Sequence, residues 1–300
     1  MKHNVKITLV LLGMFIISQF IGLAILTVYA PTVDGNLTSY NLPFGMDPPS
    51  DIEPATSLTS IILAIIIAVF IMFLLMKIKA GAFLRLWFFI VVILAIAISI
   101  NAPLLSKTPH SALIALAIAL PLAYYKIFKR NIIIHNLSEL IIYPGIAAIF
   151  VPLLNLWSII ILLIIISLYD MYAVWHAGFM QKMAQYQIDK VKVFSGFFIP
   201  YLNKKQKAMV KNSPKNAKGK DKKMNVSVAL LGGGDVVFPM MLSGVLLHSL
   251  GLLPAILTSF GATLGLASLF YYSEKGKFYP AMPFITAGCF VALGFYYLVL

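Results

Sequence analysis

The chain has 300 residues, of which 61% are apolar and 11% are charged, and its mean hydropathy is +0.94. A soluble globular domain has about a quarter of its residues charged, so this composition excludes that class. The formal net charge of +13 at pH 7 leaves two explanations, nucleic-acid binding and membrane topology, and the positions of the basic residues decide between them.

Long apolar runs follow one another along the chain, each close to the roughly 20 residues that cross a hydrocarbon layer. The first follows a basic N-terminus, but it is long for a signal peptide and lacks a clean small-residue cleavage site, which favours an uncleaved spanning helix. The predicted spanning helices cover residues 7–29, 57–76, 84–100, 110–127, 138–154, 156–177, 227–248, 251–271 and 279–299. The predicted fold class is therefore all-α: a polytopic membrane protein of nine transmembrane helices.

The basic residues lie between these runs. If the N-terminus is cytoplasmic, 22 of the 23 Lys and Arg residues fall on the cytoplasmic side, and Lys107 alone falls outside. This distribution predicts a cytoplasmic N-terminus, a cytoplasmic loop over residues 178–225 and an extracytoplasmic C-terminus. It also attributes the positive charge to the lipid bilayer, and no nucleic-acid partner is expected.

The long basic loop divides the chain into three predicted parts. Residues 1–178 form an N-terminal bundle of six helices, residues 179–225 a linker, and residues 226–300 a C-terminal bundle of three helices. Within the linker, the mixed apolar and polar stretch from Phe179 to Leu202 predicts an amphipathic segment at the membrane interface. The Lys-rich stretch that follows predicts a polar tether.

Two of the ten acidic residues, Asp170 and Asp235, lie well inside predicted spans. Asp170 is eight residues before Gly178, where its span leaves the membrane, and Asp235 is eight residues after Ser227, where its span enters, so both lie about 12 Å below the cytoplasmic interface. An aspartate at such depth costs about 2.5–3.5 kcal/mol, so each needs a partner. Two carboxylates in one site hold a proton between them, which is the basis of aspartic protease chemistry. Glu139, near the start of its span, is expected to reach the interface or pair with Lys129 or Arg130.

Glycines and prolines flank these positions. Gly232, Gly233 and Gly234 weaken the helix before Asp235 and admit another backbone. Their alternative explanation is a patch of small residues for helix packing. Pro280 likewise has a plain alternative as a helix-start proline.

Taken together, three motifs resemble those of the presenilin and signal peptide peptidase family of intramembrane aspartyl proteases. Tyr169-Asp170 is similar to the family's Tyr-Asp motif, and the glycines with Asp235 to its Gly-x-Gly-Asp motif. Pro280-Ala281-Met282 is similar to its Pro-Ala-Leu motif, with the volume-conserving change of Leu to Met. Nine spans and a long loop between the sixth and seventh agree with the family across the whole chain.

The resemblance implies an intramembrane aspartyl endopeptidase that cleaves single-span membrane proteins without a cofactor or metal. A cytoplasmic loop between spans six and seven is the presenilin arrangement, so substrates are expected to have their N-terminus outside and to be cut near the cytoplasmic face. The implied catalytic pair is Asp170 and Asp235. The implied roles of the other residues are to line the site (Tyr169), to shape the path of the substrate backbone (Gly232, Gly233, Gly234) and to hold the substrate (Pro280, Ala281, Met282).

Other membrane proteases fit the sequence poorly. None of the five histidines stands in a His-Glu-x-x-His helix, and no metal role is expected for His176. Ser195-Gly196 and Ser243-Gly244 lack the leading glycine of a rhomboid-type Gly-x-Ser-Gly. The main alternative from another class is a proton- or cation-coupled transporter that uses the buried aspartates as a relay.

Overall fold

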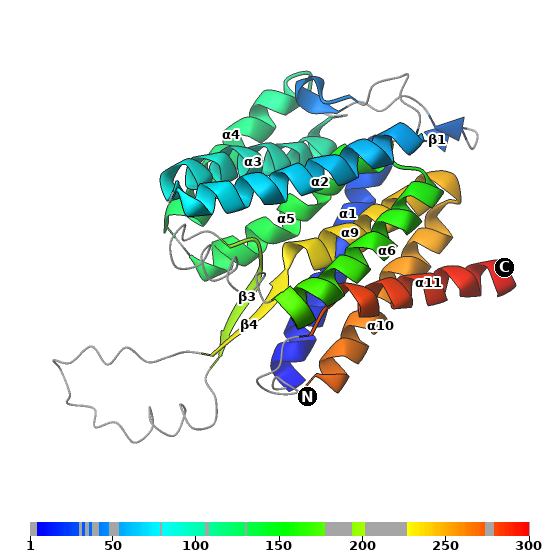
Figure 1. The fold of residues 1–300 in the computed structure, drawn as a ribbon. Helices are drawn as coiled ribbons and strands as arrows, with labels where there is room; N and C mark the ends of the chain where they lie inside the picture. Colours follow the sequence, from blue (N-terminus) through cyan, green and yellow to red (C-terminus); the bar gives the residue numbers. More distant parts are fainter. Residues whose placement is uncertain are drawn as a thin grey trace.

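The computed structural model describes residues 5–29, 32–33, 36–37, 42–47, 54–78, 80–105, 108–129, 131–177, 194–201, 227–273 and 279–299. Within these ranges the chain forms nine long helices and two small hairpins (Figure 1). The helices are α1 (Val5–Tyr29), α2 (Pro54–Lys77), α3 (Gly81–Asn101), α4 (Ser111–Tyr124), α5 (Ile132–Phe150), α6 (Leu156–Tyr172), α9 (Gly233–Ser249), α10 (Leu252–Tyr272) and α11 (Met282–Val299). The strands are β1 (Thr32–Val33), β2 (Asn36–Leu37), β3 (Gly196–Tyr201) and β4 (Ser227–Gly232).

The predicted fold class is confirmed. Eight of the described helices are long and apolar enough to cross a membrane. The ninth, α9, has 17 residues and rises about 26 Å, slightly less than the hydrocarbon thickness. The chain is therefore an all-α, multi-pass membrane protein.

One predicted span is wrong at its start. Residues 227–232 do not continue α9 but form β4, which pairs antiparallel with β3 from Gly196↔Gly232 to Tyr201↔Ser227. The alternation of buried Ala229, exposed Leu230 and buried Leu231 has the two-residue period of a strand. Glycine is a poor helix former, so Gly232 ends the strand and α9 begins only at Gly233.

The same hairpin includes part of the predicted amphipathic segment. Residues 196–201 of the stretch Phe179–Leu202 form strand β3, and the position of this stretch at the membrane interface stays a prediction. Residues 178–193 and 202–226 lie outside the described residues, as does the Lys-rich stretch. The division into two bundles and a linker stays a prediction.

Helix α5 begins six residues earlier than predicted. The side chain of Asn131 caps it by accepting hydrogen bonds from the backbone N–H groups of Ile133 (2.9 Å) and Ile134 (3.3 Å). Just before it, α4 ends in a π-helical turn, Tyr125–Lys129. Glu139 consequently lies two turns inside α5 rather than at its start.

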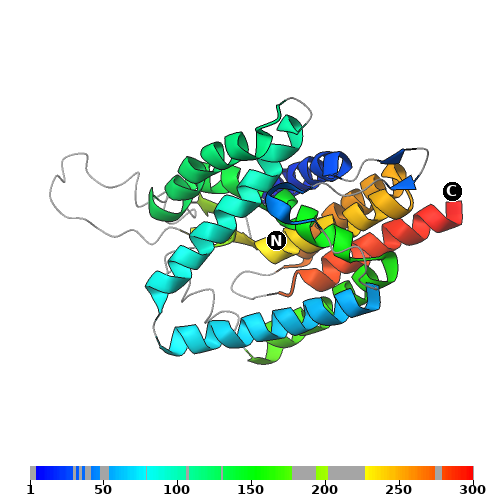
Figure 2. The ribbon, with the colours of Figure 1, turned by 90° about the horizontal axis from the view of Figure 1, so that it is seen from above.

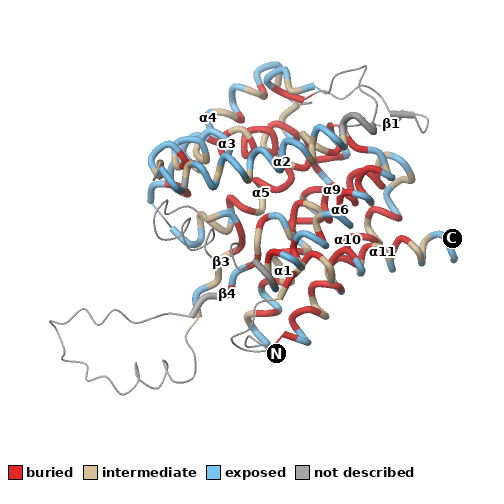
Figure 3. The backbone as a smooth tube through the Cα atoms, viewed as in Figure 1, coloured by how far each residue is buried: buried red, intermediate tan, exposed pale blue. Residues whose placement is uncertain are grey.

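Helix α9 occupies the centre of the molecule, where every residue from Pro239 to Leu247 is buried (Figure 3). It packs against α1, α5, α6 and α10. Helix α2 is the opposite case: 6% of its segment Leu58–Leu75 is buried. Figure 2 shows α2 and α3 diverging from their connection, so α2 lies at the margin of the bundle.

The C-terminal helices bring a distant segment to α6. Backbones of α10 and α11 meet at Gly261 and Gly288, where a side chain on either would collide with the other helix. Helix α11 then reaches α6 through a hydrogen bond between the hydroxyls of Ser167 and Thr286 at 2.8 Å. This packing holds the first residues of α11 beside Asp170.

Candidate active site

Asp170 lies near the C-terminal end of α6, on the face that also buries Leu163 and Ser167. Its side chain is 6% exposed. Its Oδ2 accepts a hydrogen bond from the backbone N–H of Met282 at 3.1 Å, and the carboxylate also accepts from the N–H of Ala281. The first N–H groups of α11 have no partner within their own helix, so Asp170 caps that helix from a different one.

Asp235 lies in the first turn of α9, three residues into the helix. The premise that it stands eight residues inside a helix is therefore wrong. The β4 strand delivers it instead, and its carboxylate accepts a hydrogen bond from the N–H of Gly232, the last residue of that strand. An aspartate near the start of a helix is in the position that the helix dipole favours.

The two carboxylates share one site. Asp170 and Asp235 are close enough to repel each other electrostatically. Asp170 comes from the end of α6 and Asp235 from the start of α9, and these helices pack together. Within the described residues, no cluster of His, Cys, Asp and Glu is arranged to hold a metal ion.

The other predicted residues surround this pair in different ways. Tyr169 precedes Asp170 but is 40% exposed, because consecutive helical residues face different directions. Pro280 and Ala281 lie just before α11, and Met282 is its first residue and is buried. Gly233 is buried and Gly234 is exposed, although both lie in the first turn of α9.

Gln19 is a polar residue near the site that sequence reasoning missed. It lies in α1, is fully buried, and donates from Nε2 to the backbone oxygen of Val236 at 2.9 Å. Val236 directly follows Asp235, so α1 holds the first turn of α9. The signal was present in the sequence, since an amide in the middle of an apolar span is costly unless it has a role.

Tyr143 was missed as well. It is fully buried in α5, its ring packs edge-on against Phe197 of β3 with centroids 5.4 Å apart, and its hydroxyl lies within electrostatic range of Asp235. An added Cβ on Gly233 would lie 3.0 Å from this ring. Tyr143 therefore packs between the hairpin and the start of α9.

A multi-pass helical bundle in which a buried Asp170 and a half-buried Asp235 interact electrostatically fits one class in particular: an aspartyl hydrolase of the membrane interior. The sequence profile described as "Signal-peptide peptidase, presenilin aspartyl protease" matches residues 12–300. The chain belongs to this family and is an intramembrane aspartyl endopeptidase.

Two solved structures support the fold. A presenilin family intramembrane aspartate protease, crystallised in space group C222, matches with a TM-score of 0.61, 17% identity and coverage of 95% of this chain and 96% of that one. A structure of a presenilin family intramembrane aspartate protease in space group P2 gives 0.59, 17%, and 94% of each chain. No curated protein matches in sequence. The family favours hydrolysis over the transporter alternative.

Proposed function

We propose that Asp170 and Asp235 are the catalytic pair with which this protease hydrolyses peptide bonds of single-span membrane proteins. The observation that carries this assignment is the electrostatic interaction of these two carboxylates, which the packed helices α6 and α9 contribute inside an apolar bundle. Two adjacent carboxylates hold one proton between them. The ionised one takes a proton from water as the water attacks the scissile carbonyl carbon, and the protonated one donates to the carbonyl oxygen.

An apolar cavity supports the assignment of a helical substrate. It has a volume of about 550 Å³, and it lies between α2 and the central helices. Because Val237, Phe238 and Met241 follow Asp235 on α9, the cavity starts within a turn of that carboxylate. Its lining residues are Ser60, Ile61, Ala64, Ile65, Ala68, Ile146, Phe150, Leu153, Leu162, Val237, Phe238 and Met241.

The substrate must present an extended backbone before the protease can cut it, and β4 supports that step. A peptide bond inside a helix is shielded by its neighbours, whereas a strand that adds to a sheet edge exposes each bond in turn. Strand β4 leads directly into Asp235 through Gly232. A substrate segment paired along β4 therefore arrives at the carboxylates in extended form.

The direct test is proteolysis by the purified full chain in detergent. We expect it to cut a synthetic single-span substrate, with products identified by mass spectrometry. A transition-state analogue of aspartyl proteases should stop cleavage, whereas a serine-protease inhibitor and a metal chelator should leave it unchanged. Cleavage that continues under a saturating amount of the analogue would contradict the two-aspartate mechanism.

Alanine variants of Gly233 and Gly234 distinguish a role in packing from a role in substrate access. A Cβ on Gly233 would stand 2.9 Å from Ser195 Oγ and 3.0 Å from the Tyr143 ring, so Gly233→Ala should cost about 1–3 kcal/mol through overpacking. A Cβ on Gly234 meets nothing nearer than Phe238 at 3.5 Å, and alanine favours a helix. Gly234→Ala should therefore keep the melting temperature.

The activity of Gly234→Ala should nevertheless fall, by about tenfold in kcat/KM, because its methyl group stands in the exposed space beside Asp235 where a substrate backbone must approach. Thermal unfolding and steady-state cleavage of both variants check the contrast. Equal loss of stability in the two variants, or full activity in Gly234→Ala, would be evidence against this role for the glycines.

The charge pattern supports one orientation, with the N-terminus and the 178–225 loop cytoplasmic and the C-terminus outside. The single native cysteine, Cys289, is buried and provides a silent background. In intact cells, an impermeant thiol reagent should label Phe44→Cys and spare Lys215→Cys, with both labelled after permeabilisation. The reverse pattern would overturn this orientation and the expectation of substrates with an external N-terminus.

A further inference from the structure

The outer edge of β3 is covered by side chains of α5, and Asn136 makes two of the bonds. The Asn136 amide donates from Nδ2 to the backbone oxygen of Phe198 and accepts at Oδ1 from the Phe198 N–H, both at 2.9 Å. These two bonds are the pair that a neighbouring antiparallel strand would make. Asn136 therefore occupies the place of a third strand.

The register of the hairpin leaves the other edge open. The Gly233 N–H donates to the Ser195 carbonyl at 3.3 Å, so these two residues form a hydrogen-bonded pair. Bonded and non-bonded pairs alternate along an antiparallel hairpin, so Phe198 and Leu230 form a non-bonded pair whose backbone groups point outward. On β3 those groups are held by Asn136. On β4, no group among the described residues bonds the outward N–H and C=O of Leu230.

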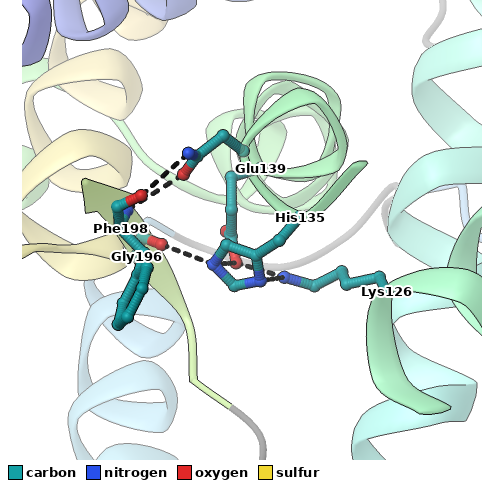
Figure 4. Close-up of polar contacts among 6 residues, drawn as sticks. Lys126, His135, Glu139, Gly196 and Phe198 are labelled. Atoms are coloured by element: carbon teal, nitrogen blue, oxygen red, sulfur yellow. Dashed lines mark hydrogen bonds and ion pairs between the residues drawn. The ribbon is translucent and has the colours of Figure 1, made fainter. Parts of the chain in front are cut away.

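Neighbouring polar groups anchor this part of α5. His135 Nε2 lies 2.9 Å from the Gly196 carbonyl, which can only accept, so Nε2 carries the hydrogen (Figure 4). His135 Nδ1 then accepts from Lys126 Nζ at 3.3 Å, and Lys126 forms an ion pair with Glu139. The side chains of Lys126 and Glu139 are 2% and 0% exposed, so this anchor is shielded from solvent.

We propose that Asn136 is a positioning residue of the protease. By filling the outer edge of β3 it directs an extended substrate to β4, and by fixing Phe198 it sets the hairpin register that decides which peptide bond meets Asp235. Strands lie about 4.8 Å apart, so a substrate on the far side of β3 would be displaced from the carboxylates by about 10 Å or more. The inference rests on the proposed function, in which the substrate pairs along β4.

The test is Asn136→Leu, which keeps the size of the side chain and removes both bonds to Phe198. We expect hydrogen exchange of the peptide covering residues 196–201 to accelerate, kcat to fall about tenfold with a smaller change in KM, and cleavage to spread to neighbouring peptide bonds in mass spectra. Asn136→Asp keeps the acceptor for the Phe198 N–H and loses the donor, so its cleavage pattern should lie between those of Asn136→Leu and the unmodified chain.

Tyr29→Phe is the control for loss of stability alone. It removes the buried hydroxyl that donates to the Ile98 carbonyl and accepts from Asn101, far along the chain from the hairpin. This control should lower the melting temperature and leave the cleavage positions unchanged. If Asn136→Leu also keeps the cleavage positions and kcat, the positioning role is refuted while the catalytic assignment stands. If instead Asp170→Asn and Asp235→Asn remain active, the proposed function itself fails.

Discussion

Asp170→Asn and Asp235→Asn should each lower cleavage of a single-span substrate by about 10³-fold or more. An amide can neither take a proton from water nor hold the proton that the pair must share, so both halves of the acid–base step are lost together. The remaining carboxylate cannot compensate, because it would have to act as acid and base in the same step. The measurement is kcat of the purified variants, with the melting temperature recorded for each.

The structure provides a matched control for these variants. Asp47, in the segment before α2, also accepts a backbone hydrogen bond, from the N–H of Leu42 at 2.7 Å. Asp47→Asn makes the same chemical change beside a backbone N–H donor and should keep its activity. Either Asn variant of the catalytic pair retaining more than about a tenth of the activity with an unchanged melting temperature would contradict the assignment.

The Ala and Asn variants of Asp170 should differ in stability. Asp170 accepts from the N–H groups of Met282 and Ala281, so Asp170→Ala removes the cap of α11, whereas Asp170→Asn keeps one acceptor oxygen. Loss of a helix cap costs about 0.5–2 kcal/mol. The melting temperature of Asp170→Ala should accordingly lie below that of Asp170→Asn, while both are inactive.

Much of this architecture could be predicted from the sequence. Long apolar runs define helices such as α1, α10 and α11 by their length, because a bilayer admits few other structures. Asp170 and Asp235 could be selected from the sequence because the other eight acidic residues lie outside the predicted spans or near their ends. Their contact could not be predicted, because it depends on how α6 and α9 are rotated about their axes and on the contact of α11 with Asp170.

The errors have a common physical cause. Strand β4 was predicted as helix because a six-residue apolar run does not distinguish the two periods, and its partner β3 lies some 30 residues earlier. The partner of Glu139 was predicted as Lys129 or Arg130, but the π-helical turn at the end of α4 directs Lys126 inward and leaves Lys129 exposed. Tertiary contacts decided both cases.

Removal of a single charge from the ion pair between Lys126 and Glu139 should be strongly destabilising. Lys126→Met leaves the Glu139 carboxylate buried without its cation, and loss of one partner of such a pair costs about 3–5 kcal/mol. Glu139→Leu should cost less, because Lys126 keeps the bond to His135 Nδ1 at 3.3 Å. The double variant Lys126→Met/Glu139→Leu removes both charges and should recover most of the stability.

Thermal unfolding of the two single variants and the double variant in detergent measures this coupling. A cost of 3–5 kcal/mol corresponds to a fall of about 5–15 °C in melting temperature for Lys126→Met, with the double variant close to the unmodified chain. Additive losses in the double variant would show that the pair contributes no coupling. Ile133→Ala, at a side chain that is 77% exposed on the same helix, should leave the melting temperature nearly unchanged, because it removes almost no buried contact.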